Sequence, residues 1–140
     1  MPVKLDLLGL AIKRAQDRDH RAMDSALRAI GVTLVQWDAL RAIDAAPAAS
    51  AHDLAVTTFQ SDQAFGTLGT RLVAAGWVER SPGVGRRLEH RLTDAGRSML
   101  ADGRAVTARV LPELFAPLVE TERAVLLELL ARLTGGASRP

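Results

Sequence analysis

Two closely spaced helix starts constrain the fold of this chain more than any other feature. Ser50 stands three residues before Asp53, and Ser61 opens a second, longer amphipathic run. A serine at such a position accepts a backbone N–H of the first helical turn, and so favours a helix start. The spacing predicts a short helix, a tight turn around Phe59, and a longer helix that runs to Ala75.

The longer helix has two contrasting faces. At about 100° per residue, one apolar stripe is predicted to be buried and comprises Phe65, Leu68, Leu72 and Ala75. The opposite face carries small polar side chains and one guanidinium, from Gln63, Thr67, Thr70 and Arg71. A short helix, a tight turn and a longer amphipathic helix are typical of a helix-turn-helix, and the polar face suits the floor of a DNA groove.

Two glycines interrupt this helix, Gly66 and Gly69. Each costs about 1 kcal/mol relative to alanine in a helix interior, so each needs a reason. Gly69 lies near the buried stripe, where close packing explains it. Gly66 lies to the side, where close packing and the approach of a phosphate backbone are equally good explanations.

A β-hairpin follows directly. Residues 77–80 predict a strand, residues 81–85 a turn and residues 86–92 a returning strand, in which Leu88, His90 and Leu92 share one face. Between Arg80 and Arg91 there are four arginines and one acid, whereas the whole chain carries a net charge of only +2. The positive charge is therefore concentrated on the hairpin. The chain has 16 Arg and 2 Lys, a bias that either phosphate recognition or a G- and C-rich genome explains.

A long helix is predicted before this region. The first thirty residues carry a heptad-like apolar seam that either includes Asp19 or drifts onto Met23, and Gly31 ends the helix. Thr33 and Gln36 have the spacing of a capping box, which predicts the start of the next helix.

Two helices are predicted after the hairpin. The first runs from Asp94 to about Val110 and is broken by Pro112; the second spans about Thr121 to Leu133. This last helix is apolar on more than one face. Such a helix suggests burial against a second subunit, and the alternative is that it folds back onto the first helix of its own chain.

Several protein classes are excluded by composition. The chain has no cysteine, which removes disulfides, thiol nucleophiles and cysteine zinc sites. Its longest uncharged run, residues 29–37, is far too short to span a bilayer, and no signal peptide is expected, so we predict a cytoplasmic protein. The three histidines lack metal-ligand spacing, and nucleotide-binding or nucleophile motifs are absent from the sequence. We expect no catalysis, no metal and no cofactor.

Four stretches resemble the MarR (multiple antibiotic resistance regulator) family of bacterial transcription factors. They are residues 33–40 (TLVQWDAL), 53–55 (DLA), 71–80 (RLVAAGWVER) and 91–96 (RLTDAG). The resemblance covers about residues 5–134. It implies a mainly α fold with a small β-hairpin wing, forming a single domain over residues 1–140. In it, a winged helix-turn-helix (residues 32–98) lies between N- and C-terminal dimerisation helices (residues 1–30 and 105–135).

The resemblance also implies a function and a site. It implies a homodimeric regulator, expected to be a repressor, that binds an inverted repeat in double-stranded DNA. The longer helix would enter the major groove and the wing an adjacent minor groove. The residues expected to contact DNA are Ser50, Ser61, Gln63, Thr67, Thr70, Arg71, Arg86 and Arg87.

The wing and the recognition helix depart from the family pattern. Val84 stands where many members have an aspartate that orients the wing arginine, and the wing is about two residues shorter. Thr67 stands where many members have a basic residue. The base preference of relatives therefore does not carry over.

The resemblance further implies a small aromatic or phenolic effector that releases the DNA. His20, Met23 and Trp37 are the candidates to line its site. The alternatives are that Trp37 is an ordinary core residue and that His20 is solvated. For His90, the two alternatives are a hydrogen-bonded, partly covered histidine and a pH or ligand switch.

One other function fits the same residues. A helical dimer with a degenerate winged domain would bind a partner protein or a small ligand without reading DNA. Val84, the two recognition-helix glycines and the modest net charge favour this alternative.

Overall fold

The structure, a computed structural model, describes residues 1–85 and 87–136. In this part the chain forms six helices and one antiparallel hairpin, as expected of a mainly α fold with a small wing. In chain order they are α1 (Leu5–Arg28), α2 (Leu34–Ala45), α3 (Ala51–Thr57), α4 (Asp62–Ala74), β1 (Val78–Pro82), β2 (Leu88–Leu92), α5 (Asp94–Leu114) and α6 (Glu120–Leu133).

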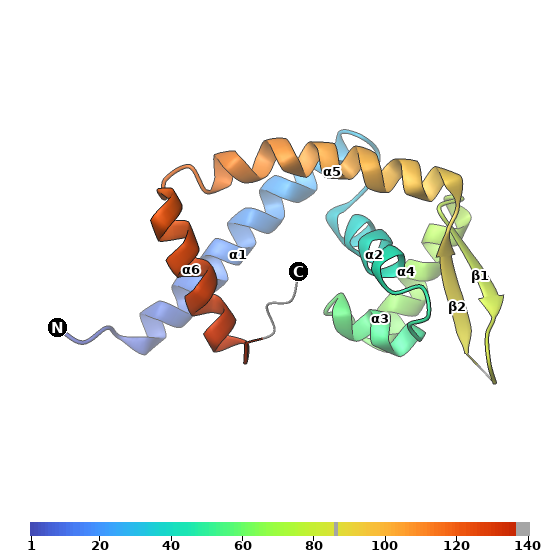
Figure 1. The fold of residues 1–140 in the computed structure, drawn as a ribbon, viewed down its shortest axis with the longest axis horizontal. Helices are drawn as coiled ribbons and strands as arrows, with labels where there is room; N and C mark the ends of the chain where they lie inside the picture. The colour runs from blue at the N-terminus through green and yellow to red at the C-terminus, as the bar shows by residue number, and fades with distance from the viewer. Residues whose placement is uncertain (86, 137–140) are drawn as a thin grey trace.

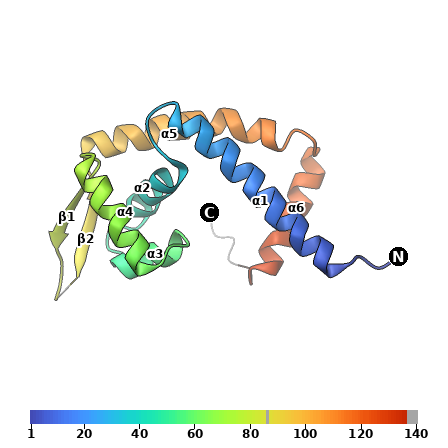
Figure 2. The same cartoon turned by 180° about the vertical axis from the view of Figure 1, so that it is seen from behind.

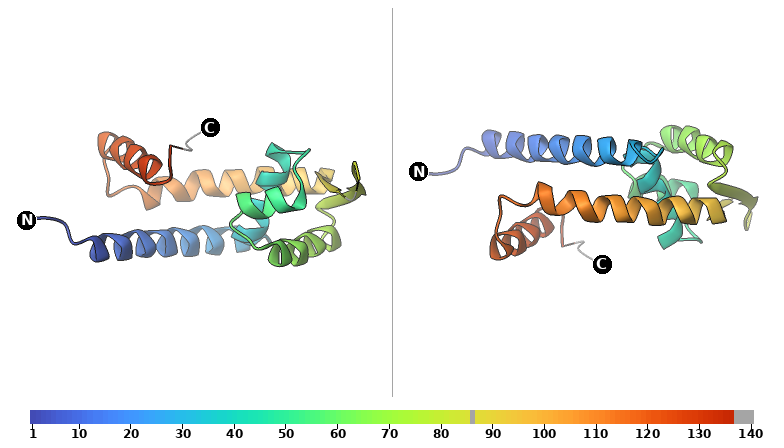
Figure 3. Two further views of the ribbon diagram at one scale, coloured as in Figure 1. Left: turned by 90° about the horizontal axis from the view of Figure 1, so that it is seen from below. Right: turned by 90° about the horizontal axis from the view of Figure 1, so that it is seen from above.

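The molecule is an arch whose top is α5 (Figure 1). At one end of α5, the helices α2, α3 and α4 and the hairpin form a compact unit, which we call the hairpin lobe. At the other end lie α6 and the N-terminal half of α1 (Figure 2). α1 and α5 run alongside and contact each other, and both extend from one end of the arch to the other (Figure 3).

The core fills the hairpin lobe, and the C-terminal end of α1 closes it. Leu27 is fully buried, and Met23, Ala26 and Ile30 pack against the same cluster. The apolar seam of α1 therefore drifts onto Met23, because a helix of 3.6 residues per turn does not keep a seven-residue register. Leu27 lies beside the strict seam and was not predicted to be buried.

Predicted helix boundaries are confirmed at the start of α2. The hydroxyl of Thr33 accepts the N–H of Gln36 at 3.1 Å, and the carboxamide of Gln36 accepts the N–H of Thr33 at 3.0 Å. This reciprocal capping box satisfies two backbone donors that a helix start leaves free. Just before it, Gly31 adopts φ 91° and ends α1 in the left-handed conformation that glycine allows.

The predicted break at Pro112 is wrong, because α5 continues to Leu114. Proline removes one backbone donor, but here the loss falls in the last turn, where little helix remains to be disrupted. The side chain of Leu114 is buried, and its carbonyl accepts a hydrogen bond from Nη1 of Arg18 on α1 at 3.0 Å. Tertiary contacts therefore hold the final turn of α5 in place.

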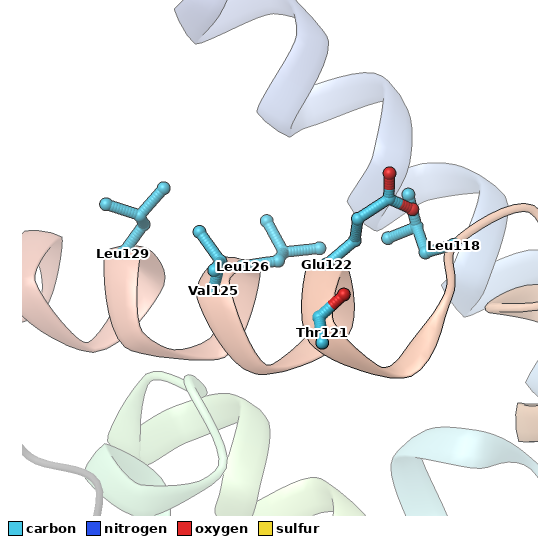
Figure 4. A pocket seen from close by; sticks show the side chains of 6 residues that line it. All are labelled: Leu118, Thr121, Glu122, Val125, Leu126 and Leu129. Carbon is cyan, nitrogen blue, oxygen red and sulfur yellow. The ribbon is translucent and has the colours of Figure 1, made fainter.

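α6 does not fold back onto the rest of its own chain. None of its residues is buried in the described part of the chain. An open groove of about 400 Å³ runs along it, and Leu126 and Leu129 point to the same side of the helix there (Figure 4). The exposed apolar side chains of α6 are Val125, Leu126, Leu127, Leu129, Leu130 and Leu133.

Candidate nucleic-acid interface

The helix-turn-helix consists of α3, a tight turn and α4, and serine caps fix both helix starts. The hydroxyl of Ser50 accepts the N–H of Asp53, and that of Ser61 accepts the N–H of Ala64, each at 3.1 Å. In the turn, Phe59 adopts φ 58°, and its side chain is 96% exposed. The predicted helix, turn and helix are confirmed.

An ion pair joins the two helix starts. Nδ1 of His52 on α3 lies 2.8 Å from Oδ1 of Asp62 on α4. The hydrogen bond and the charge of Asp62 raise the pKa of His52 above its usual 6.5. This pair lies on the exposed surface beside both caps.

α4 presents its predicted polar face to solvent. Gln63, Thr67, Thr70 and Arg71 are all exposed on this helix. The hydroxyls of Thr67 and Thr70 donate to backbone carbonyls one turn earlier, at 3.2 and 3.1 Å, and each oxygen keeps the capacity to accept a hydrogen bond.

The opposite side of α4 is buried at Phe65, Leu68, Gly69 and Leu72. Ala75, predicted to continue this stripe, is exposed. The reason is that α4 ends at Ala74 and the chain turns at Gly76, where φ is 79°, so the helical register no longer applies.

Arg80 on β1 joins the wing to α4, a contact that sequence analysis missed. Its Nη2 donates to the carbonyl of Gly66 at 3.1 Å, and its Nη1 donates to the hydroxyl of Thr70 at 3.3 Å. A Cβ on Gly69 would overlap the same guanidinium. Close packing therefore explains Gly69, as predicted, and Arg80 is the packing partner.

His90 on β2 lies directly across the hairpin from Arg80. The imidazole is 3% exposed, and the Phe65 ring of α4 meets it edge-on at 5.8 Å. Its Nδ1 has no hydrogen-bond partner among the described residues, so the expected hydrogen bond is not found at this atom. Burial, together with the charge of Arg80, lowers the pKa of His90 below 6.5.

The wing is a short two-stranded ribbon. β1 extends through Pro82, two residues beyond the predicted strand, and the N–H of Gly83 donates to the carbonyl of Arg87 at 2.7 Å. The side chain of Arg87 is exposed, as is Val84 at the tip. The other predicted wing residue, Arg86, lies outside the described residues.

The charge of the wing is partly paired on its outer face. Nη2 of Arg91 donates to Oε2 of Glu79 at 3.0 Å across the two strands. Such exposed pairs contribute little to stability, but this one occupies one of the four hairpin arginines.

The three predicted effector residues lie where α1 meets α2. Trp37 is 3% exposed and its indole N–H donates to the carbonyl of Leu100 at 3.2 Å, a geometry that favours the core interpretation. Met23 packs against the core and His20 is half-exposed. Burial raises the pKa of Asp38, one residue from Trp37, and the charges of Arg41 and His20 oppose that rise.

A second cavity opens beside this junction. It measures about 390 Å³, and its lining includes Asp38 and Arg41 of α2 and Arg104 of α5. No cluster of three or more potential metal ligands occurs among residues 1–85 and 87–136. Within the same residues, no helix is long and apolar enough to cross a membrane.

Comparison with known proteins places this geometry in a family. Residues 30–87 match the MarR family. The HTH-type transcriptional repressor Rv2887 of Mycobacterium tuberculosis is 37% identical over 101 residues, which are 68% of this chain and 73% of that protein. The chain belongs to the MarR family. The resemblance of the sequence to this family is thus confirmed.

Solved MarR-family structures share the whole fold. CouR, a transcriptional repressor bound to a 23-mer DNA duplex, superposes with a TM-score of 0.85 at 28% identity, over 96% of this chain and 99% of that one. A mutant MarR from E. coli in complex with operator DNA gives 0.84 at 25% identity, over 90% and 92%. Rv2887 in complex with salicylic acid gives 0.74 at 28% identity, over 90% and 95%.

Proposed function

We propose that the protein is a homodimeric transcriptional repressor that binds an inverted repeat in double-stranded DNA. One observation carries the proposal: α4 exposes a continuous polar face beside an arginine-bearing wing, in a fold that CouR and MarR use while bound to DNA. A regulator of this kind acts in the cytoplasm, where bacterial DNA lies, and its function requires no catalysis.

The recognition helix in this proposal is α4. Its small side chains let the helix backbone approach the floor of a major groove, where Gln63, Thr67 and Thr70 meet base edges. Arg71, at the flank, binds a phosphate or a guanine. The serine-capped helix starts at Ser50 and Ser61, which the His52–Asp62 pair joins, add contacts to the phosphate backbone.

The wing supplies the second contact. Arg87, with Arg86, enters the neighbouring minor groove, where the negative potential favours a guanidinium. Without a carboxylate at Val84 to orient them, these arginines contribute affinity more than sequence discrimination.

The dimer forms through the end of the arch that carries α6. Residues 1–30 and 105–135 are the proposed dimerisation segments, and residues 32–98 the DNA-binding region. The support is the exposed apolar surface of α6, where six large apolar side chains of one helix are open to solvent. Two-fold symmetry then places two copies of α4 about one helical turn of DNA apart.

An aromatic acid is the proposed effector, since the relative Rv2887 binds salicylic acid. Its site lies near His20, Met23 and Trp37, beside the adjoining cavity, where an effector carboxylate would compete with two aspartates for Arg41 and Arg104. Salicylic acid is expected to raise the melting temperature of the protein in a concentration-dependent way. A melting temperature that stays constant up to millimolar salicylate would contradict this site.

The function is tested by titrating the protein against the duplex upstream of its own gene and against a scrambled duplex, at several salt concentrations. We expect a preference of about 10³-fold or more for the native duplex, and an affinity that falls steeply with salt. Weak and equal binding to both duplexes would favour the alternative, a dimer that binds a partner protein or a ligand.

A further inference from the structure

Arg80 fills a space that the sequence of α4 leaves for it. Gly69 is buried on the side of α4 that faces the hairpin, and any larger residue there would overlap the Arg80 guanidinium. The backbone carbonyl of Gly66 also accepts a hydrogen bond from that guanidinium. Of the two glycines that weaken α4 as an isolated helix, Gly69 is the one that Arg80 requires, because a Cβ on Gly66 would meet open space.

The same guanidinium contacts the proposed reading face. Its other amino group donates to the hydroxyl of Thr70, which we place against base edges. The two hydrogen bonds bind successive turns of α4, so Arg80 constrains both the position and the rotation of the helix relative to β1. A planar fork is suited to such a two-point contact, whereas an ammonium group is not.

His90 lies opposite Arg80 on the neighbouring strand. The two residues are paired in the hairpin register and share the face that packs on α4. Each has one buried polar atom without a partner among the described residues, Nε of Arg80 and Nδ1 of His90. The Nε–H is a donor, and Nδ1 of a neutral imidazole with its proton on Nε2 is an acceptor, so the two atoms are complementary, although no hydrogen bond joins them in this structure.

We propose that Arg80 is a positioning residue that fixes the recognition helix against the wing, and that a neutral His90 holds its guanidinium in place. The inference rests on the proposed function of α4 and the wing in DNA binding. Protonated His90 loses its acceptor at Nδ1 and becomes a second cation beside Arg80. Operator recognition is then weakened at acid pH.

The charged groups around His90 determine whether its protonation strengthens or weakens operator recognition. On β1, Arg80 is the charged group that shares the inner face of the hairpin with His90. On α4, the Phe65 ring packs against the imidazole. The nearby side chains that α2 and α3 place in the core are apolar. Arg97 of α5 binds the carbonyl of Leu92 and the carboxylate of Asp94, and Glu79, Glu89 and Arg91 occupy the outer face of the hairpin. Among the described residues, no carboxylate shares the inner face with His90 to stabilise its charged form.

The first test compares Arg80→Lys and Arg80→Gln in the titration with native and scrambled duplexes. If Arg80 positions α4, both variants lose about tenfold in affinity for the native duplex, keep their affinity for the scrambled one, and retain the salt slope of the parent. A direct phosphate contact would give the opposite pattern. Arg80→Lys would then bind normally, and Arg80→Gln would bind both duplexes more weakly with a shallower slope.

The second test uses Gly69→Ala, which displaces the guanidinium without removing any charge. We expect it to reproduce the loss of preference seen in Arg80→Gln, and the double variant to lose no more than either single variant, because both substitutions disrupt the same interaction. Additive losses in the double variant would overturn the assignment. The same cycle applied to urea unfolding needs no DNA, so it tests the Gly69–Arg80 contact even if the protein fails to bind the native duplex specifically.

The third test concerns His90 and is made in a His52→Gln background, since His52 also titrates. As the pH falls below 6.5, the preference for the native duplex should decline by about tenfold over the range in which the protein stays folded. His90→Gln, which keeps an acceptor and does not titrate, should bind normally with a flat profile. His90→Leu should bind weakly with a flat profile. A His90→Gln profile that matches the parent would exclude His90 as the switch.

Discussion

Glycines in the helices have different surroundings, and these surroundings predict opposite effects of one added methyl group. Gly103 of α5 lies against the buried indole of Trp37, which a Cβ would overlap, whereas a Cβ on Gly66 of α4 would meet open space. The Trp37 side chain cannot easily move, because it is enclosed in the core and hydrogen-bonded to Leu100.

Gly103→Ala is therefore expected to destabilise the protein by about 1–3 kcal/mol through overpacking. Gly66→Ala, the matched control, is expected to stabilise it by up to about 1 kcal/mol, since alanine is the better helix former. Urea unfolding of the two variants measures both effects. Equal stability of Gly103→Ala and the parent would show that the indole is not confined as described.

The ion pair of His52 with Asp62 makes the stability of the protein depend on pH. Its pKa is raised by Asp62, so the folded protein holds the proton more tightly than the unfolded chain does. The resulting stabilisation is fully present below pH 6.5 and is lost as the pH rises through the raised pKa of the folded state. An NMR titration should show the pKa of His52 above 6.5 in the parent and lowered towards that value in Asp62→Asn. An unchanged pKa in the variant would exclude the ion pair as the cause.

At the scale of elements, the wing is expected to contribute affinity rather than discrimination. Arg86→Ala combined with Arg87→Ala should weaken binding to native and scrambled duplexes alike, and should reduce the salt slope by about 0.9 for each phosphate that an arginine no longer neutralises. An unchanged slope in the wing variant would remove the wing from the proposed interface.

Local signals predicted most of the elements. Caps at Thr33, Ser50 and Ser61 and the glycine at residue 31 act within one helical turn, so their effect can be read from spacing alone. The continuation of α5 through Pro112 could not be predicted this way, because it depends on the buried Leu114 and on Arg18 from another helix.

The candidate site also has one part that local sequence predicts and one part that depends on tertiary contacts. The exposed face of α4 follows from helical periodicity, and Gln63, Thr67, Thr70 and Arg71 are exposed as predicted. Arg80 was missed because its partners lie on α4, outside its own strand. Two signals pointed to Arg80. Its side chain lies on the same face of β1 as that of Val78, two residues earlier, and it pairs with His90, which is also on the covered face. Contact of any of these residues with DNA stays a prediction.

At the scale of the whole molecule, the proposed dimer depends on the exposed apolar side chains of α6. Leu129 lines the exposed groove of α6. Leu129→Asp should place a charge in the proposed dimer interface and convert the dimer to a monomer, with loss of specific DNA binding. Glu128→Gln, its neighbour on the same helix, should leave the dimer intact. Light scattering distinguishes the two states, and a dimeric Leu129→Asp variant would place the interface elsewhere.

The most direct test of the proposed function is a crystal structure of the protein with the duplex that it prefers in the titration. We expect one dimer on the inverted repeat, with each α4 in a major groove, Thr67 and Thr70 within hydrogen-bonding distance of base edges, and Arg87 in the adjacent minor groove. A complex in which α4 faces away from the DNA would show that this helix does not read the operator.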